Sequence, residues 1–153
     1  MSTSRNGSEA MNAGVLLVDV DGVTLPLCRG EYEAAARRVL EAFGYTAIGF
    51  VYRLSASRGV HVAVWVSPEP ELQYVPLLQY LLGSDPAREC INYERIRRGV
   101  DINVLFSGRK RVHKTGGLKC RPELMCPGLV KMIELAKEIG IERVELRGGC
   151  AKI

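Results

Sequence analysis

The chain has 153 residues, a formal net charge of +4 and an isoelectric point near 8.9. Hydrophobic residues make up 47% of it and charged residues 25%, as in ordinary globular proteins, and no apolar run approaches the roughly 20 residues that a membrane-spanning helix needs. We therefore expect no membrane partner and one domain at residues 13–153, preceded by a polar, disordered lead-in at residues 1–12 that lacks the apolar stretch of a signal peptide.

The five cysteines are scattered along the chain and odd in number. This usage is not that of a secreted disulfide framework and favours a reducing, cytoplasmic location. Cys120 and Cys126 have no second pair at zinc-ligand spacing, so we expect free thiols rather than metal ligands. The scarcity of glutamine, with abundant arginine, glutamate and valine, follows the trend of thermophilic proteins.

Apolar and β-branched runs predict the strands. Residues 15–21 form a continuous apolar run that ends in acidic residues, which is typical of a central strand. Residues 46–54 and 60–66 are rich in β-forming residues and lie on either side of a short turn, which predicts a hairpin. Residues 100–107 and 141–147 complete the predicted strands.

Helical periodicity and composition predict the helices. Residues 31–43 are rich in alanine, and a glycine follows them as a helix end signal. Residues 71–82 are expected to be helical, residues 87–98 either helical or irregular, and residues 127–139 helical from a proline in the first turn.

The predicted element order is β-α-β-β-α-(α)-β-loop-α-β. This order predicts an α+β fold of two layers, in which helices cover one face of a mixed or antiparallel sheet. The longest predicted loop, residues 108–126, is basic and contains glycines, which is typical of functional loops.

Two acidic residues, Asp19 and Asp21, end the first predicted strand. Alternate residues of a strand project from the same face, so these carboxylates should lie together. Two neighbouring carboxylates repel each other unless a proton or a cation relieves them, and Mg²⁺ is commonly held by one or two carboxylates plus substrate phosphates. The pair therefore predicts a metal site, although an Asp-Gly turn alone would be an ordinary structural feature.

The predicted hairpin turn contains residue types that suit a phosphate. It reads Ser55-Ala56-Ser57-Arg58-Gly59-Val60-His61. The hydroxyls, the Arg58 guanidinium and His61 can bind anionic oxygens, and Gly59 permits close approach of the backbone. A histidine on a strand is otherwise more often a hydrogen-bonded core residue.

A third carboxylate would complete a site for two metal ions. Asp101 begins the predicted strand at residues 100–107 and is the natural candidate. Asp85, which precedes a proline, is the competitor, and an ordinary turn acid is the simpler explanation for it. The basic residues of the long loop, Arg109, Lys110 and His113 among them, can face a phosphate backbone or a triphosphate, or can simply be a solvated surface.

Taken together, these motifs resemble the archaeo-eukaryotic primase superfamily. The resemblance is carried by four segments: the strand ending in Asp19-Val20-Asp21-Gly22, the turn from Ser55 to His61, the apolar segment around Asp101, and His113-Lys114-Thr115-Gly116. This superfamily includes primase catalytic subunits, primase-polymerases and ligase-associated polymerase domains. The resemblance covers roughly residues 15–117.

The resemblance implies a template-dependent nucleotidyltransferase that uses nucleoside triphosphates and two Mg²⁺ or Mn²⁺ ions, in a primase-polymerase or RRM-like core. Asp19, Asp21 and Asp101 would hold the metals, and His61 would contact the phosphates of the incoming nucleotide. The residues implied in binding the triphosphate or template are Ser55, Ser57, Arg58, Arg109, Lys110 and His113. Implied partners are a nucleic-acid template, nucleoside triphosphates and a larger replication subunit or helicase.

Two departures from the superfamily pattern keep other functions open. No arginine closely follows Asp101, and Ala56 replaces a glycine of the second motif. The chain is also short, so a non-catalytic nucleic-acid-binding or replication accessory subunit that retains the fold is an alternative.

A second resemblance shares only the first motif. The Asp19-Val20-Asp21-Gly22-Val23 segment is similar to the opening of haloacid dehalogenase-like, Mg²⁺-dependent phosphatases, in which the first aspartate is a nucleophile. That family also needs a late acidic pair and a Rossmann-like order, and a hairpin after the first helix fits that order poorly.

Overall fold

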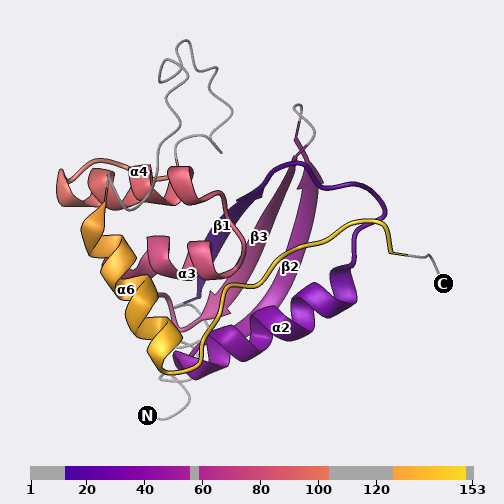
Figure 1. Ribbon diagram of the computed structural model, residues 1–153, viewed down its shortest axis with the longest axis horizontal. Helices are drawn as coiled ribbons and strands as arrows, with labels where there is room; N and C mark the ends of the chain where they lie inside the picture. Colours follow the sequence, from indigo (N-terminus) through magenta and orange to yellow (C-terminus); the bar gives the residue numbers. More distant parts are fainter. Residues whose placement is uncertain (1–12, 56–58, 104–125, 151–153) are drawn as a thin grey trace, which may run out of the picture.

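The computed structural model describes residues 13–55, 59–103 and 126–150 (Figure 1). In this part of the chain the fold is α+β, with a three-stranded antiparallel sheet and four α-helices. The elements in chain order are β1 (Gly14–Val20), α2 (Arg29–Ala42), β2 (Thr46–Leu54), β3 (Val60–Ser67), the short 3₁₀ helix η1 (Leu72–Tyr74), α3 (Val75–Leu81), α4 (Pro86–Arg97) and α6 (Pro127–Glu138).

The sheet has the order β1-β3-β2, so the hairpin partner β3 is the central strand. β1 pairs antiparallel with β3 from Gly14 opposite Val66 to Val20 opposite Val60. β2 pairs antiparallel with the other edge of β3, with a register shift between Ala47 and Gly49. The predicted hairpin is confirmed, and it leaves the outer edge of β1 as a free edge.

The two faces of the sheet differ sharply in burial. Leu16, Val18 and Val20 of β1 are buried, as are Val60, Val62, Val64 and Val66 of β3, because alternate residues share a face. This face packs against α2, whose buried residues Tyr32, Ala36, Val39 and Leu40 have helical spacing. In Figure 1, α2 and the C-terminal segment cross in front of the sheet.

Side chains from α3 and from the turn before α4 satisfy the free edge of β1. The Gln79 carbonyl oxygen Oε1 accepts a hydrogen bond from the Leu17 amide at 2.8 Å, and the Ser84 hydroxyl accepts one from the Asp19 amide at 3.0 Å. The Asp85 amide in turn donates to the Asp19 carbonyl at 2.8 Å. An exposed strand edge invites pairing with other chains, and these three bonds close it.

A buried network of hydrogen-bonded polar side chains includes Gln79 and so supports this edge. The Glu89 carboxylate is fully buried and accepts hydrogen bonds from the side-chain amides of Gln79 at 2.8 Å and Asn92 at 3.0 Å. Asn103 joins the network, because its amide nitrogen donates to Asn92 at 3.0 Å and its side chain bonds both Gln79 and Asn92. Asn103 has a φ of 55°, a left-handed conformation that asparagine tolerates better than most residues.

The C-terminal segment at residues 141–150 is extended but is not a strand of the sheet, so the predicted strand at residues 141–147 is wrong. Its amides bond outside any ladder: Val144 donates to the Leu81 carbonyl at 2.7 Å, and a single bridge joins Leu27 to Gly148. Alternating apolar residues are present because Ile141, Val144 and Leu146 bury against the helices rather than against a neighbouring strand.

Arg143 in this segment holds the end of α3. Its guanidinium donates to the carbonyls of Tyr80 at 2.7 Å, Ser84 at 2.8 Å and Gly83 at 3.2 Å. Carbonyls at a helix C-terminus lack partners within the helix and carry partial negative charge, so a cation there stabilises the turn. Arg143 therefore fixes the turn that carries Ser84 and Asp85 to β1.

Most of the other predicted elements are confirmed. The first, second and third strands and the helices at residues 31–43 and 127–139 are present, and α4 settles residues 87–98 as helix. The helix predicted at residues 71–82 is divided into η1 and α3. The strand predicted at residues 100–107 is absent at residues 100–103, and residues 104–107 lie outside the described part, as does nearly all of the loop at 108–126.

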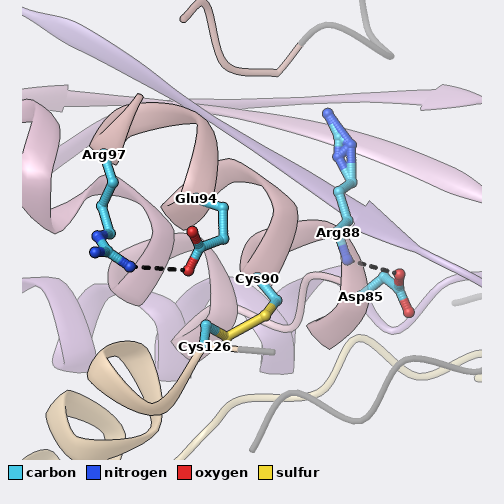
Figure 2. The surroundings of a disulfide bond; sticks show 6 residues. All are labelled: Asp85, Arg88, Cys90, Glu94, Arg97 and Cys126. Carbon is cyan, nitrogen blue, oxygen red and sulfur yellow. Dashed lines mark hydrogen bonds and ion pairs between the residues drawn. A yellow bond between two sulfur atoms is a disulfide. The ribbon is translucent and has the colours of Figure 1, made fainter. Parts of the chain in front are cut away.

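The cysteine prediction is wrong for four of the five residues. A disulfide joins Cys28 to Cys150. A second disulfide joins Cys90 to Cys126 (Figure 2). The paired cysteines are 122 and 36 residues apart, and the sequence alone does not indicate which cysteines pair. Disulfides are rare in cytosolic proteins, with intracellular proteins of hyperthermophiles as the exception, so the reducing environment predicted from the cysteines is not supported.

Among the described residues, no helix is long and apolar enough to cross a membrane.

We predict that the Cys28–Cys150 disulfide contributes strongly to stability. A crosslink over this span restricts the unfolded chain, and removing it by the double substitution Cys28→Ser and Cys150→Ser should lower the free energy of unfolding by about 4 kcal/mol. Urea unfolding without reductant measures the loss. Peptide mapping under non-reducing conditions should recover the two crosslinked pairs, and an unfolding midpoint that reductant leaves unchanged would contradict the assignment.

We predict that Glu89 makes the protein less stable as the pH rises. Burial raises the pKa of the Glu89 carboxyl to about 7, against an ordinary value of 4.5. The folded state thus binds the proton more tightly than the unfolded state. The stabilisation is complete below about pH 4.5 and is lost as the pH rises to about 7, by roughly 3 kcal/mol at most.

The matched test is the substitution Glu89→Gln, which imitates the protonated carboxyl and keeps an acceptor for Gln79 and Asn92. Urea unfolding at pH 5 and pH 8 should show a smaller loss of stability in this variant than in the wild type. Glu134→Gln, at an exposed position of α6, should behave as the wild type. Equal pH dependence in all three proteins would rule out a buried, titrating Glu89.

Candidate functional site

One row of side chains crosses one end of the sheet, on the face that does not pack against α2. Asp19 of β1 lies opposite His61 of β3, and His61 lies opposite Arg53 of β2. The His61 Nε2 atom is 3.4 Å from the Asp19 Oδ1 atom, and both side chains are partly exposed. The register of the sheet thus brings the first motif next to the second.

The hairpin turn closes directly against the second acid of the first motif. The Ser55 hydroxyl accepts a hydrogen bond from the Gly59 amide at 3.0 Å, and the Ser55 amide donates to the Gly59 carbonyl at 2.9 Å. A Cβ atom at Gly59 would lie 2.8 Å from the Val20 carbonyl oxygen and 3.2 Å from the Asp21 Oδ1 atom. A side chain at this position would collide with these atoms, which explains why the motif has a glycine here.

Several charged residues near Asp19 shift the pKa of its carboxyl. Burial raises the pKa of the Asp19 carboxyl, and the negative charges of Asp21 and Asp85 raise it further, while Arg88 and His61 act in the opposite direction. A cation would relieve the repulsion that the neighbouring carboxylates exert on Asp19.

Arg88 is a charged residue near the acid pair that was not predicted from the sequence. Its side chain is 4% exposed, and burial lowers its pKa while the negative charges of Glu89, Asp19, Asp85 and Asp21 raise it. Figure 2 shows the Arg88 side chain extending from α4 away from the Cys90–Cys126 disulfide. Arginine is almost never fully buried unless it is paired with an opposite charge. The only sequence signal for Arg88 is its place in the Asp-Pro-x-Arg start of a helix.

Asp85 has a clear structural role. Its carboxylate accepts a hydrogen bond from the Arg88 amide at 3.1 Å and caps the N-terminus of α4, with Pro86 in the first helical turn. Burial raises the pKa of Asp85, the Arg88 amide lowers it, and the charge of Asp21 raises it again. The residue is thus near the first acid pair, while the helix cap alone explains its presence.

Asp101 is exposed and follows α4. Its carbonyl accepts a hydrogen bond from the Arg95 Nε atom at 2.6 Å, and within the described residues it is not among the charges that shift the pKa of Asp19. Two residues later, Asn103 bonds Gln79, whose Oε1 atom also accepts from Leu17 of β1. The segment that carries Asp101 is therefore tied to the edge of β1 through one side chain.

The remaining predicted site residues lie outside the described part of the chain. These are Ser57, Arg58, Arg109, Lys110 and His113.

The described residues offer hard oxygen donors but no closed metal cage. The one set of three potential ligands whose atoms all lie within 4.8 Å of one another is Cys28, Glu31 and Cys150, and its two sulfur atoms form a disulfide. Asp19 and Asp21 do fit a hard divalent cation in chemistry, since carboxylates are the ligands that Mg²⁺ prefers and the two charges repel. A small hollow of about 300 Å³ lies between the loop after β1 and the hairpin turn, lined by residues 22–25, Leu54, Ser55 and Gly59.

Comparison with known proteins finds no family model, no curated protein and no solved structure that matches this chain.

Proposed function

We propose that this protein is a template-dependent nucleotidyltransferase of the primase-polymerase type, which joins nucleoside triphosphates with the help of divalent metal ions. The observation that carries the proposal is the meeting of the first two motifs. Asp19 faces His61 across the β1–β3 pair, and Gly59 packs against Asp21. Acid pair, histidine and glycine turn thus share one end of the sheet.

The proposed roles follow from charge and position. Asp19 and Asp21 would hold Mg²⁺ or Mn²⁺, which when bound activates an attacking hydroxyl and stabilises a pyrophosphate leaving group. His61 would orient the triphosphate, and the hollow beside Ser55 and Gly59 leaves room for it. Arg88 adds a buried positive charge that limits the repulsion between the carboxylates.

For the third carboxylate we propose Asp101 rather than Asp85. The primase resemblance implies Asp101, and the Asn103–Gln79–Leu17 contacts tie its segment to the edge of β1. Asp85 is accounted for by its cap on α4.

The other candidate functions fit less well. A haloacid dehalogenase-like phosphatase needs a Rossmann-like order, whereas an antiparallel hairpin follows α2 here. A non-catalytic nucleic-acid-binding subunit would have no need for the close approach of Gly59 to Asp21. The two disulfides suit a cytoplasmic replication protein only if its host keeps intracellular disulfides, as hyperthermophiles do.

We predict that Asp19→Asn and Asp101→Asn each lower template-dependent nucleotide incorporation by about 100-fold or more, because each removes charge that would face a metal ion. Asp85→Asn should lower it by less than about 10-fold, since asparagine caps a helix nearly as well as aspartate. The assay uses labelled nucleotides, a primed and an unprimed template, and Mn²⁺ or Mg²⁺.

The variants also separate the competing assignments. A severe loss in Asp85→Asn with full activity in Asp101→Asn would make Asp85 the third ligand. Full activity in Asp19→Asn, or no product from the wild type under any of these conditions, would refute the proposed function. Hydrolysis of a chromogenic phosphate ester that depends on Asp19 would favour the phosphatase instead.

We predict that Gly59→Ala impairs nucleotide incorporation about 10-fold or more, because the added methyl group would press on the Val20 carbonyl and on Asp21. Gly30→Ala is the matched control. It lies in α2 with open space around a Cβ atom, so activity should be unchanged and the helix slightly more stable. Equal activity in both variants would show that the turn does not need its close approach to the acids.

A further inference from the structure

Within the described part of the chain, the face of the sheet that does not pack against α2 carries three cross-strand rows. Asp19, His61 and Arg53 form the polar row, Leu17, Ala63 and Val51 form the next, and Val15, Trp65 and Gly49 form the third. We call these nine residues the open face. Val51 is 56% exposed and Trp65 44% exposed, although both are large and apolar.

Trp65 stands among small neighbours. Gly49 lies opposite it on β2, and a Cβ atom at Gly49 would have nothing within 4 Å. Ala63, two residues before Trp65 on β3, adds only a methyl group to the same face. The indole therefore has free space beside it on the described part of the open face, as a ring needs in order to receive a stacked partner.

We propose that the open face binds single-stranded nucleic acid, with a base stacked on Trp65 and the backbone passing over Arg53 toward the Asp19–His61 pair. This inference deepens the proposed function, and rests on it, by naming where the template strand lies. Sheet faces with exposed aromatic residues bind single strands in this way, since every base has a face that stacks on an aromatic ring.

The chemistry of the rows favours a nucleic acid as occupant. One end of the open face offers an aromatic ring, and the other offers the Arg53 guanidinium and the His61 imidazole, which suit phosphate oxygens. The basic isoelectric point of 8.9 adds a favourable long-range field. An apolar peptide would leave Arg53 and Asp19 without a complementary partner.

A second copy of the chain fits the open face poorly. Three strands spaced by about 4.8 Å and about seven residues long give a face of roughly 300 Å². A stable protein interface buries about 800 Å² on each partner, so this face is too small to hold a dimer.

The dimensions of the open face suit a short run of nucleotides. Trp65 and His61 are four residues apart on β3, or about 13 Å at 3.3 Å per residue. A stacked strand rises about 3.4 Å per nucleotide, so about four nucleotides would span the distance from the indole to the candidate catalytic residues.

Trp65 is the only tryptophan of the chain, so its fluorescence reports on the open face directly. Titration with ten-nucleotide oligo(dT) and oligo(U), without metal or nucleoside triphosphate, should quench this fluorescence saturably, and the affinity should fall as salt rises. The two oligonucleotides show whether DNA or RNA is preferred. A mononucleotide should quench far less.

Variants identify the residues that bind. In fluorescence anisotropy with a labelled ten-nucleotide strand, Trp65→Ala should weaken binding about 5- to 100-fold, and Trp65→Phe should restore most of it because phenylalanine still stacks. Arg53→Gln should weaken binding and lower the salt dependence by about one phosphate contact. Leu72→Ala, at an exposed apolar residue away from the sheet, is the control and should bind as the wild type.

The outcomes distinguish this inference from the proposed function. Absence of quenching, or wild-type affinity in both Trp65→Ala and Arg53→Gln, would overturn the open-face proposal even if the enzyme incorporates nucleotides. Binding that depends on Trp65, without any nucleotide incorporation by the wild type, would support the open face and refute the catalytic function. Quenching by a second copy would appear as a dependence on protein concentration without oligonucleotide, and would also overturn the proposal.

Discussion

The structure depends on how the free edge of β1 is closed. A strand edge presents amides that water or another strand would otherwise take. Here the Gln79 and Ser84 side chains accept from the Leu17 and Asp19 amides, and the Asp85 amide donates to the Asp19 carbonyl. Because these three groups come from α3 and the turn that follows it, one set of bonds both ends the sheet and brings α4 next to the first acidic motif.

This arrangement has an energetic cost, because it removes polar side chains from water. Gln79, Ser84 and Glu89 are fully buried polar residues, and a buried polar group is tolerable only when its hydrogen bonds are made. Arg143 holds the carbonyls of the same turn from the opposite side. The edge of the sheet that carries Asp19 is thus positioned by a polar network, whereas the buried face of the sheet rests on the packing of valines and leucines against α2.

The sequence was a good guide wherever local pattern decides structure. The buried strands, the hairpin and the alanine-rich helix follow from periodicity and from turn residues. It was a poor guide where distant contacts decide. Residues 141–147 alternate like a strand but bury against helices, and the cysteines pair across 122 and 36 residues. Neither feature has a local signal. Arg88 also meets Asp19 and Asp21, which are distant in the sequence.

The Cys90–Cys126 disulfide has a consequence for the basic stretch between residues 103 and 126. Asn103, at one end of the stretch, is bonded to Asn92 of α4, and Cys126, at the other end, is crosslinked to Cys90 of the same helix. Both ends are therefore fastened two residues apart on one rigid element. The entropy of closing a loop grows only slowly with its length, so the stretch can gain or lose residues at little cost to the rest of the fold. The charge and length of this stretch could therefore change during evolution without a change in the sheet or in its acidic residues.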